Sequence, residues 1–201
     1  DTQICRYAFG YTKLTSVTIP DGMTLEEGVF AQCKDLQTVV IGNDVTVGKF
    51  AFNMDKDESY NVEEYMENDT KYFRYVFGSA LESLTIGDNA VLGDNCFAGH
   101  ASMEAVTLGK NAQVGKMAFY NCTGLKYIDL SAATTIGEYA FSGDEYYVCL
   151  DNQMSVAAVS TEGFYISTFH APALEEVDLS AATSIGEYAF YNCEKLKSIN
   201  I

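Results

Sequence analysis

The chain has 201 residues, 48% of them apolar, and a formal net charge of -16 at pH 7 with a pI near 4.3. Such an acidic chain is repelled by nucleic acid and by anionic membrane surfaces, which argues against both as partners. No apolar run approaches the roughly 20 residues that a helix needs to cross a bilayer, so no membrane insertion is expected. The composition leaves a basic protein, a cation or a neutral glycan as partner classes.

One short pattern recurs along the whole chain with a period of 22 residues. Each copy contains a phenylalanine that is followed by a strand pattern such as Leu36-x-x-Val39-x-Ile41. A period of about 20 to 29 residues with this strand pattern indicates a leucine-rich repeat solenoid, whose units bury their apolar sides by stacking. We therefore expect one domain over residues 1–201. The repeat phenylalanines are Phe9, Phe30, Phe52, Phe97, Phe119, Phe141 and Phe190.

The expected fold is a right-handed solenoid with a short parallel β-sheet on its concave face and irregular loops or short turns on its convex side. Five residues before each repeat phenylalanine the chain is apolar, which places that column in the core. Four residues before it the chain is mostly glycine, which predicts either a positive φ or a close approach of neighbouring turns. Cys33, Cys122 and Cys193 occupy the column three residues after the phenylalanine, and we expect them to be free, buried thiols.

Residues between the apolar strand positions point away from the core, because side chains alternate along a strand. Their central row is neutral in the first repeats and acidic later, with Asp129 and Asp178 in it; the row two residues earlier holds Tyr127 and Glu176. Stacked carboxylates of this kind would bind a cation or a basic partner. The alternative is a solvated acidic face with no ligand.

A family resemblance follows from two repeated strings. Ile-Gly-Glu-Tyr-Ala-Phe stands at 136–141 and 185–190, and Tyr-Asn-Cys stands at 120–122 and 191–193. With the strand pattern in register, the chain resembles the BspA-type leucine-rich repeat proteins over its whole length outside two insertions. The resemblance implies a secreted or surface-displayed protein of a host-associated bacterium or a protist, with a role in adhesion to host matrix components or other microbes. It implies no catalytic residues.

Residues 53–80 and 142–173 interrupt the repeat at the same place, between the phenylalanine and the next strand. Both insertions should therefore leave the same edge of the solenoid and form two walls of one recess. Each is acidic and aromatic, which suits glycan stacking or a basic protein patch. The alternative is that these rings pack under their own loops. The aromatic candidates are Tyr65, Tyr72, Phe73, Tyr75, Tyr146, Tyr147, Phe164 and Tyr165.

The secondary structure of the insertions is predicted from spacing alone. Apolar residues over 61–77 lie loosely at helical spacing, which predicts a short helix. Residues 146–150 and 154–159 flank a polar Asp-Asn-Gln stretch and predict a hairpin, and 163–169 predicts a further strand.

No sequence motif of a hydrolase, metalloprotease, phosphate-binding loop or EF-hand is present. His100 shares a column with Cys122, but two ligands do not make a metal site, and a structural stack is favoured. Cys149 and His170 lie in one insertion and form only a weak candidate dyad. We expect no enzyme activity, no cofactor and no metal.

The sequence therefore favours a non-enzymatic, extracellular or cell-surface binding module of the adhesion type, which recognises a protein, basic or from the host matrix, or a glycan. The alternative is a structural spacer within a larger surface protein, with no ligand of its own. The sequence does not indicate the oligomeric state.

Overall fold

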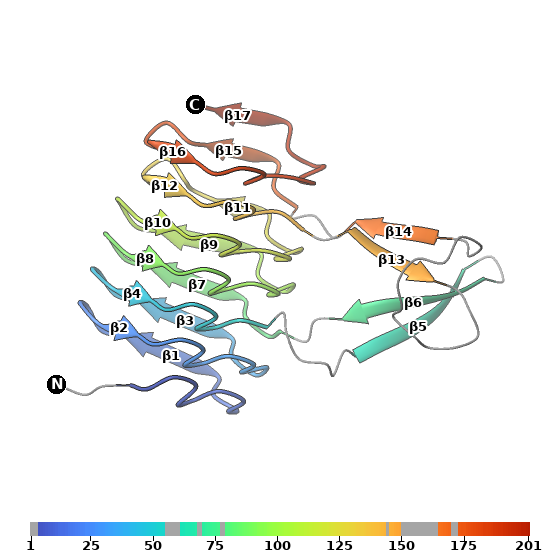
Figure 1. Ribbon diagram of the computed structural model, residues 1–201, viewed down its shortest axis with the longest axis horizontal. Helices are drawn as coiled ribbons and strands as arrows, with labels where there is room; N and C mark the ends of the chain where they lie inside the picture. The colour runs from blue at the N-terminus through green and yellow to red at the C-terminus, as the bar shows by residue number, and fades with distance from the viewer. Residues whose placement is uncertain are drawn as a thin grey trace.

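The computed structural model describes residues 4–54, 61–67, 70–76, 79–143, 145–149, 165–169 and 173–201; within 61–76, 145–149 and 165–169 it describes the backbone. The chain winds as a stack of similar coils with its termini at opposite ends (Figure 1). Two parallel sheets run along the stack. We number the turns 1 to 7 in chain order, by the strand that each forms from the Leu-x-x-Val-x-Ile pattern. The described residues contain no helix, and so none that could span a membrane.

Sheet A is the sheet predicted from the Leu-x-x-Val-x-Ile pattern. Its strands pair in parallel and in register, so that Val17 lies opposite Val39 and Val39 opposite Leu84. Alternate residues are buried, as the burial of Val39 and Ile41 in turn 2 shows. The strands are β1 (Ser16–Ile19), β3 (Thr38–Ile41), β7 (Ser83–Ile86), β9 (Ala105–Leu108) and β11 (Tyr127–Ile128); β15 (Glu176–Asp178) and β17 (Ser198–Asn200) form a separate parallel pair.

A second parallel sheet, sheet B, lies where the sequence predicted only irregular loops and short turns. The apolar column five residues before each phenylalanine forms its inner row, with Leu25 and Val47 paired and buried. Two-residue strands suffice because each continues the hydrogen bonding of the turn below it. The strands are β2 (Thr24–Leu25), β4 (Thr46–Val47), β8 (Val91–Leu92), β10 (Gln113–Val114), β12 (Thr135–Ile136) and β16 (Ser184–Ile185).

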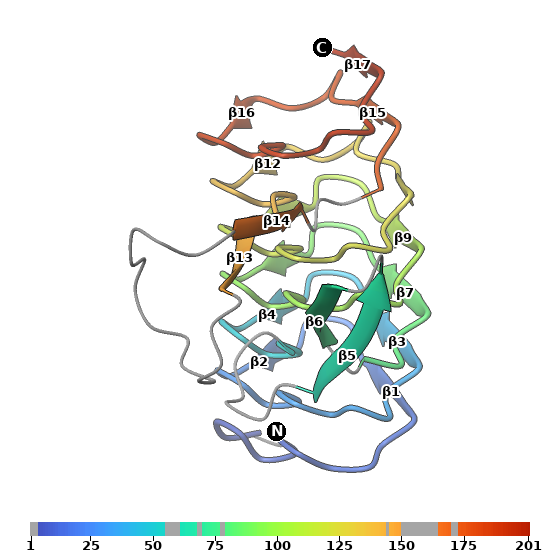
Figure 2. The same cartoon turned by 90° about the vertical axis from the view of Figure 1, so that its right-hand side faces the viewer.

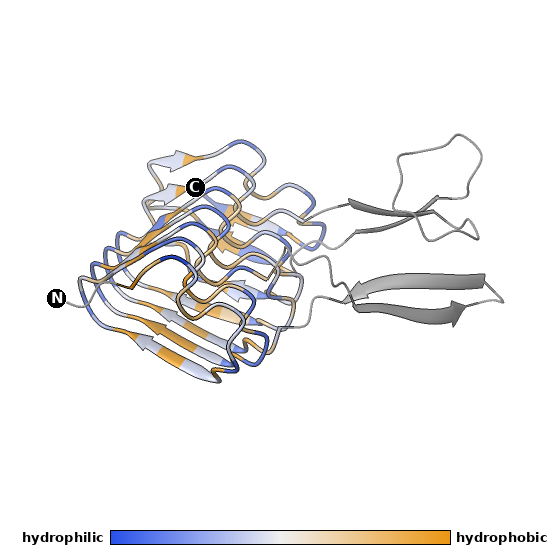
Figure 3. Cartoon of the chain, turned by 60° about the horizontal axis from the view of Figure 1, so that its bottom comes forward, coloured by the Kyte–Doolittle hydropathy of each residue, from blue (hydrophilic) through white to orange (hydrophobic). Residues whose placement is uncertain are grey.

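The repeat phenylalanines form one continuous stack through the core. Successive ring centroids are 5.0 to 5.7 Å apart, with planes within 5 to 11° of parallel. Phe52, Phe97, Phe119 and Phe141 are fully buried. Burying a side chain of this size contributes about 1.5 to 3 kcal/mol. Figure 3 shows the same hydrophobic positions recurring from turn to turn.

The glycine column is explained by close approach of neighbouring turns and not by a positive φ. A Cβ added at Gly93 would lie 2.6 Å from the carbonyl oxygen of Val47 in the turn below, a distance that side chains do not tolerate. The residues with a positive φ lie two positions after the glycines of this column, as at Asn95 (φ 55°), Met117 (φ 54°) and Tyr139 (φ 54°).

The cysteine column is a row of buried thiols, as the sequence predicts. Cys33, Cys122 and Cys193 are buried, and each thiol donates to the carbonyl oxygen of a repeat phenylalanine in the turn below, at 3.1 to 3.2 Å. Burial raises the pKa of Cys193 to about 12. The column therefore consists of small buried side chains that satisfy backbone carbonyls.

Each insertion contains an antiparallel hairpin. β5 (Asn61–Glu67) pairs with β6 (Thr70–Val76), so the predicted helix over 61–77 is wrong. Tyrosine, phenylalanine and valine favour strands, and these outweigh a loose helical spacing. β13 (Glu145–Cys149) pairs with β14 (Tyr165–Phe169), so the strand predicted at 146–150 pairs with 165–169. Residues 154–159 lie outside the described residues. Figures 1 and 2 show both hairpins on one lateral side of the stack.

Candidate binding groove between β11 and β15

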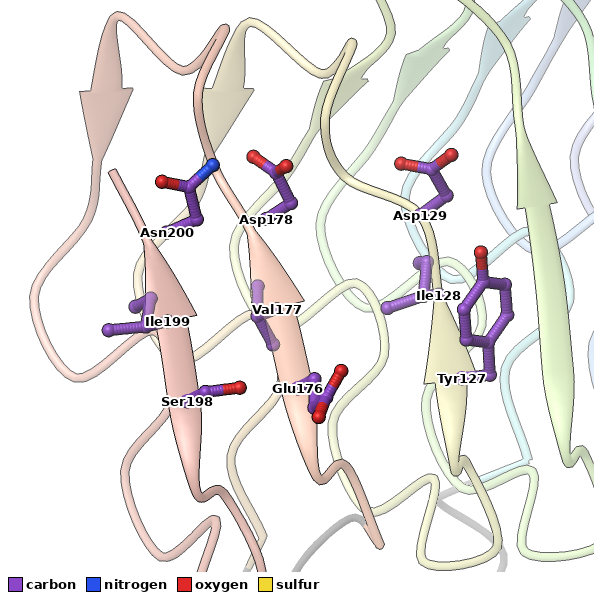
Figure 4. A pocket seen from close by; sticks show the side chains of 9 residues that line it. All are labelled: Tyr127, Ile128, Asp129, Glu176, Val177, Asp178, Ser198, Ile199 and Asn200. Carbon is purple, nitrogen blue, oxygen red and sulfur yellow. The ribbon is translucent and has the colours of Figure 1, made fainter.

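Sheet A is interrupted between turns 5 and 6. β9 and β11 pair, and β15 and β17 pair, but β11 and β15 are not hydrogen-bonded to each other. The same two turns stay joined elsewhere, since β12 pairs with β16 and the amide of Phe141 donates to the carbonyl of Ala189 at 2.8 Å. The opening is therefore confined to sheet A, and Figure 4 shows β15 set farther from β11 than from β17.

The interruption coincides with two aspartates in the outward row. In a continuous sheet Asp129 and Asp178 would be direct neighbours, and like charges directly opposite each other destabilise strand pairing. At the same position turns 3 and 4 pair Thr85 with Thr107. Strand β11 also ends at Ile128, two positions before the end of β9, and the Asp129 carboxylate that follows accepts a hydrogen bond from the amide of Ser131 at 2.9 Å.

An open groove of about 320 Å³ lies on the face of sheet A here, lined by β11, β15 and β17. Ile128 and Val177 form its buried floor, 2% and 5% exposed. Asp129 and Asp178 point outward beside each other at one end, and Tyr127, 61% exposed, stands with Glu176 at the other (Figure 4). The complete lining is Tyr127, Ile128, Asp129, Glu176, Val177, Asp178, Ser198, Ile199 and Asn200.

Both aspartates in the groove are held in their ionised form. Hydrogen bonds from the hydroxyl and amide of Ser131 lower the pKa of Asp129, and the nearby charge of Asp178 opposes this in part. The amide and hydroxyl of Ser180, together with Asn200, lower the pKa of Asp178. A carboxylate that accepts such bonds is stabilised as the anion. The groove therefore carries negative charge at neutral pH.

Two ion pairs flank the groove without crossing it. The Lys126 ammonium contacts the Glu104 carboxylate at 2.7 Å on one side, and the Lys197 ammonium contacts Glu175 at 2.7 Å on the other. In the described part of the chain, no ion pair involves Asp129, Glu176 or Asp178. The lysines therefore neutralise glutamates outside the groove and leave its own carboxylates to attract a partner.

The structure places the predicted site residues in two groups. The four residues predicted on the sheet face, Tyr127, Asp129, Glu176 and Asp178, line this one groove. The aromatic residues of the insertions lie in the hairpin strands, where only the backbone is described, so the predicted recess stays a prediction. Tyr65 is in β5; Tyr72, Phe73 and Tyr75 are in β6; Tyr146 and Tyr147 are in β13; Tyr165 is in β14; Phe164 lies outside the described residues.

Neither the break in the sheet nor the groove floor of Ile128 and Val177 was predicted from the sequence. A signal was present, because Asp129 and Asp178 are the only successive residues of the outward row that carry like charges. Charge repulsion between neighbouring turns would have marked this interval as the weakest in sheet A.

His100 and Cys122 form separate structural contacts. His100 is 2% exposed, and its Nε2 lies 2.6 Å from the carbonyl oxygen of Phe52. Its Nδ1 lies 2.6 Å from the hydroxyl of Ser79, while the Cys122 thiol donates to the Phe97 carbonyl. Among the described residues no group of three or more potential metal ligands is present. His170 and the side chain of Cys149 lie outside what the structure describes.

Comparisons with known proteins agree with the repeat. The family profile described as "BspA type Leucine rich repeat region" matches in six copies over residues 2–108, 70–165 and 90–201. Solved structures similar to the chain include a leucine-rich repeat protein from Bacteroides ovatus, 18% identical with a TM-score of 0.45. Another is a leucine rich cell surface protein from Faecalibacterium prausnitzii, 19% identical with a TM-score of 0.36.

Each of these two likenesses covers 98% of this chain, which spans 57% of the first protein and 50% of the second. A search of curated proteins finds no match.

Proposed function

Because the chain belongs to the BspA-type leucine-rich repeat family, we propose that it is a non-enzymatic module of the adhesion type that acts at the cell surface and binds a basic region of another protein. Repeat solenoids present extended, preformed surfaces and commonly act as binding scaffolds. One similar structure is that of a leucine rich cell surface protein, and the proposed location agrees with it. The proposed contact is the groove between β11 and β15.

The observation that carries this proposal is the gathering of ionised carboxylates where sheet A is interrupted. Asp129, Glu176 and Asp178 surround one groove, and two flanking lysines are engaged with other glutamates. The net charge of -16 adds a long-range attraction for basic partners. Complementary charge of this kind raises the association rate and selects the partner.

A rigid scaffold supports the groove. Leu125, Leu130, Leu174 and Leu179, which flank its strands in sequence, are each 0 to 1% exposed. The phenylalanine stack continues beneath it through Phe141 and Phe190, whose ring centroids are 5.3 Å apart. A preformed site loses little conformational freedom on binding, which favours affinity.

The test compares charge removal in the groove with the same change elsewhere. A double variant Asp129→Asn and Asp178→Asn removes two charges while each amide oxygen can still accept the bond from Ser131 or Ser180. The matched control is Asp21→Asn with Asp88→Asn, because these carboxylates also accept a backbone amide bond, at 2.8 Å, but lie outside the groove.

The probe is immobilised polylysine, with neutral polysaccharides as the second arm. The unaltered chain and the control variant should be retained on polylysine at low salt, and the groove variant should be retained less. Equal retention of the two variants would reject the groove as the site. If the chain is retained only on the polysaccharides, its partner is a glycan and not a basic protein. If it is retained on neither support, the structural spacer with no ligand is favoured.

A further inference from the structure

We propose that turns 6 and 7, residues 173–201, unfold together as one unit while turns 1 to 5 stay folded, and that repulsion between carboxylates of turns 5 and 6 sets how often this opening occurs. The unfolding does not depend on the proposed function. Its consequence for the groove does, because the groove is lined by Ile128 of turn 5 and Val177 of turn 6, and the opening would take these two residues apart.

Turns 5 and 6 are joined through one sheet, whereas turns 4 and 5 are joined through two. In sheet B, β12 pairs with β16 over two residues, and beyond these strands the amide of Tyr139 donates to the Glu187 carbonyl at 3.0 Å. In sheet A, β11 and β15 share no hydrogen bond. Turns 4 and 5 pair both through β9 with β11 and through β10 with β12. Local unfolding follows the boundary with the fewest such contacts, and this interval is therefore where it should begin.

Two pairs of carboxylates occupy equivalent positions on the two sides of this interval. Asp129 and Asp178 point outward beside each other from sheet A (Figure 4). Glu138 and Glu187 each lie two residues beyond the paired strands β12 and β16. Like charges directly opposite each other destabilise strand pairing. Repulsion at both places therefore favours separation of turn 6 from turn 5.

The ion pairs of this region lie on either side of the interval. Lys116 contacts Glu138 at 2.9 Å and joins turns 4 and 5, and Lys197 contacts Glu175 at 2.7 Å and joins turns 6 and 7. In the part of the chain that the structure describes, no ion pair joins turn 5 to turn 6, and Glu187 has no basic partner. Exposed pairs contribute little individually. Their placement nevertheless secures the turns on each side and leaves only repulsion between turns 5 and 6.

Turns 6 and 7 should unfold together once they separate from turn 5. β15 and β17 pair in register over three residues, so the two turns are joined to each other. Two turns bury too little apolar surface to stay folded alone, since stacked repeats need about three units. A chain that frays from its end would instead lose turn 7 first and keep turn 6 in place. The two behaviours differ at Gly186, whose amide donates across the interval to the Ile136 carbonyl at 2.7 Å.

Amide hydrogen exchange of the intact chain, followed residue by residue by NMR, tests this difference. The amide of Lys197 donates to the Glu175 carbonyl at 2.8 Å inside the unit, and that of Gly137 donates to Val114 at 2.8 Å between turns 4 and 5. Unfolding as one unit predicts the same free energy of opening for Gly186 and Lys197, and a clearly higher one for Gly137. If Gly186 is protected as strongly as Gly137 while Lys197 exchanges rapidly, the chain frays from its end and the proposal is wrong.

A charge reversal tests the role of repulsion. Glu187→Lys places a cation at the position equivalent to Glu138, so the amides of Gly186 and Lys197 should exchange about fivefold more slowly at low salt. High salt should also slow their exchange in the unaltered chain, because it screens the repulsion, and should have less effect on the variant.

The matched control is Glu82→Lys, which makes the same change of charge at an exposed position in turn 3. This variant should leave the exchange of Gly186 and Lys197 unchanged. If both variants slow the exchange equally, the net charge of the chain governs the opening, and repulsion between turns 5 and 6 does not.

Discussion

The chain leaves the solenoid twice at the same point of the repeat, and the two returns differ. After the first insertion, β7 joins β3 in register over four residues. After the second, β15 does not join β11. A long insertion is therefore not sufficient to open the sheet, and the difference must lie in the residues that receive the returning chain.

Three short hydrogen bonds secure the first return. His100 contacts the Phe52 carbonyl, just before the insertion, and the hydroxyl of Ser79, near the end of the insertion, each at 2.6 Å. The hydroxyl of Ser102 donates to the carbonyl of Ser79, also at 2.6 Å. Because a carbonyl only accepts, His100 Nε2 carries the proton and Nδ1 accepts from Ser79. One imidazole thus holds both ends of the insertion.

Cys193 holds the corresponding position at the second return. Its thiol donates to the Phe141 carbonyl at 3.2 Å, as His100 does to Phe52, but it is a smaller side chain with one polar atom. The described residues 173–176 show no backbone hydrogen bond to turn 5, whereas the amide of Ala80 donates to Lys34 at the first return. The imidazole therefore secures a returning strand, and the thiol leaves it free to separate under charge repulsion.

The largest effect should come from His100→Ala. This change leaves the Phe52 carbonyl and the Ser79 hydroxyl without their partner and opens a cavity, so the free energy of unfolding should fall by about 3 to 4 kcal/mol. Cys193→Ala, the matched change at the second return, should cost about 1 kcal/mol. Urea denaturation followed by circular dichroism measures both. Equal losses would show that the two returns are secured alike.

Low pH should weaken the contacts that His100 makes at the first insertion. Burial lowers the pKa of His100 to about 4, against 6.5 in an exposed histidine. The unfolded chain therefore binds more protons between these values, so stability is fully present above about pH 6.5 and is lost as the pH falls toward 4. The full effect is about 3 kcal/mol, from the 1.4 kcal/mol that each pKa unit represents.

The pH effect of His100 is isolated by difference, since carboxylates also titrate in an acidic chain. The stability of His100→Gln should fall less than that of the unaltered chain between pH 6.5 and 4, because glutamine does not titrate. Parallel pH profiles of the two proteins would contradict a role for this imidazole.

The sequence predicts the regular part of this molecule because the core is repeated. The Leu-x-x-Val-x-Ile pattern locates sheet A, and the phenylalanine period gives the central stack. The departures from the regular structure depend on contacts of single residues, which a repeating pattern does not describe. Asp129 and Asp178 were interpreted as a favourable acidic row, although the 22-residue register already makes them neighbours whose like charges repel. His100 likewise looks like a column residue until Ser79 is beside it in space.

Closing the groove is a direct test of the role of charge repulsion. Asp129→Thr with Asp178→Thr restores the residue type found in turns 3 and 4, so β11 and β15 should pair. Amide hydrogen exchange at Ile128 and Glu176 should slow, thermal stability should rise slightly, and binding of a basic peptide should be lost. Val40→Thr in turn 2 is the control, since it makes the same outward row more uniform without altering charge. Unchanged amide exchange would show that the break in sheet A is caused by the chain that follows the second insertion and not by charge repulsion.

The smallest effect should come from Lys126→Ala beside the groove. Lys126 pairs with Glu104 at 2.7 Å, but both side chains are more than half exposed, and such pairs contribute little to stability. The melting temperature should therefore hardly change. Removing a positive charge next to Asp129 and Glu176 should nevertheless strengthen binding of a basic peptide by about two- to threefold at low salt, an advantage that screening abolishes at high salt.

Lys13→Ala, which removes the same charge far from this interval in the first repeat, should leave the affinity unchanged. If both variants strengthen binding equally, net charge and not the groove determines the attraction.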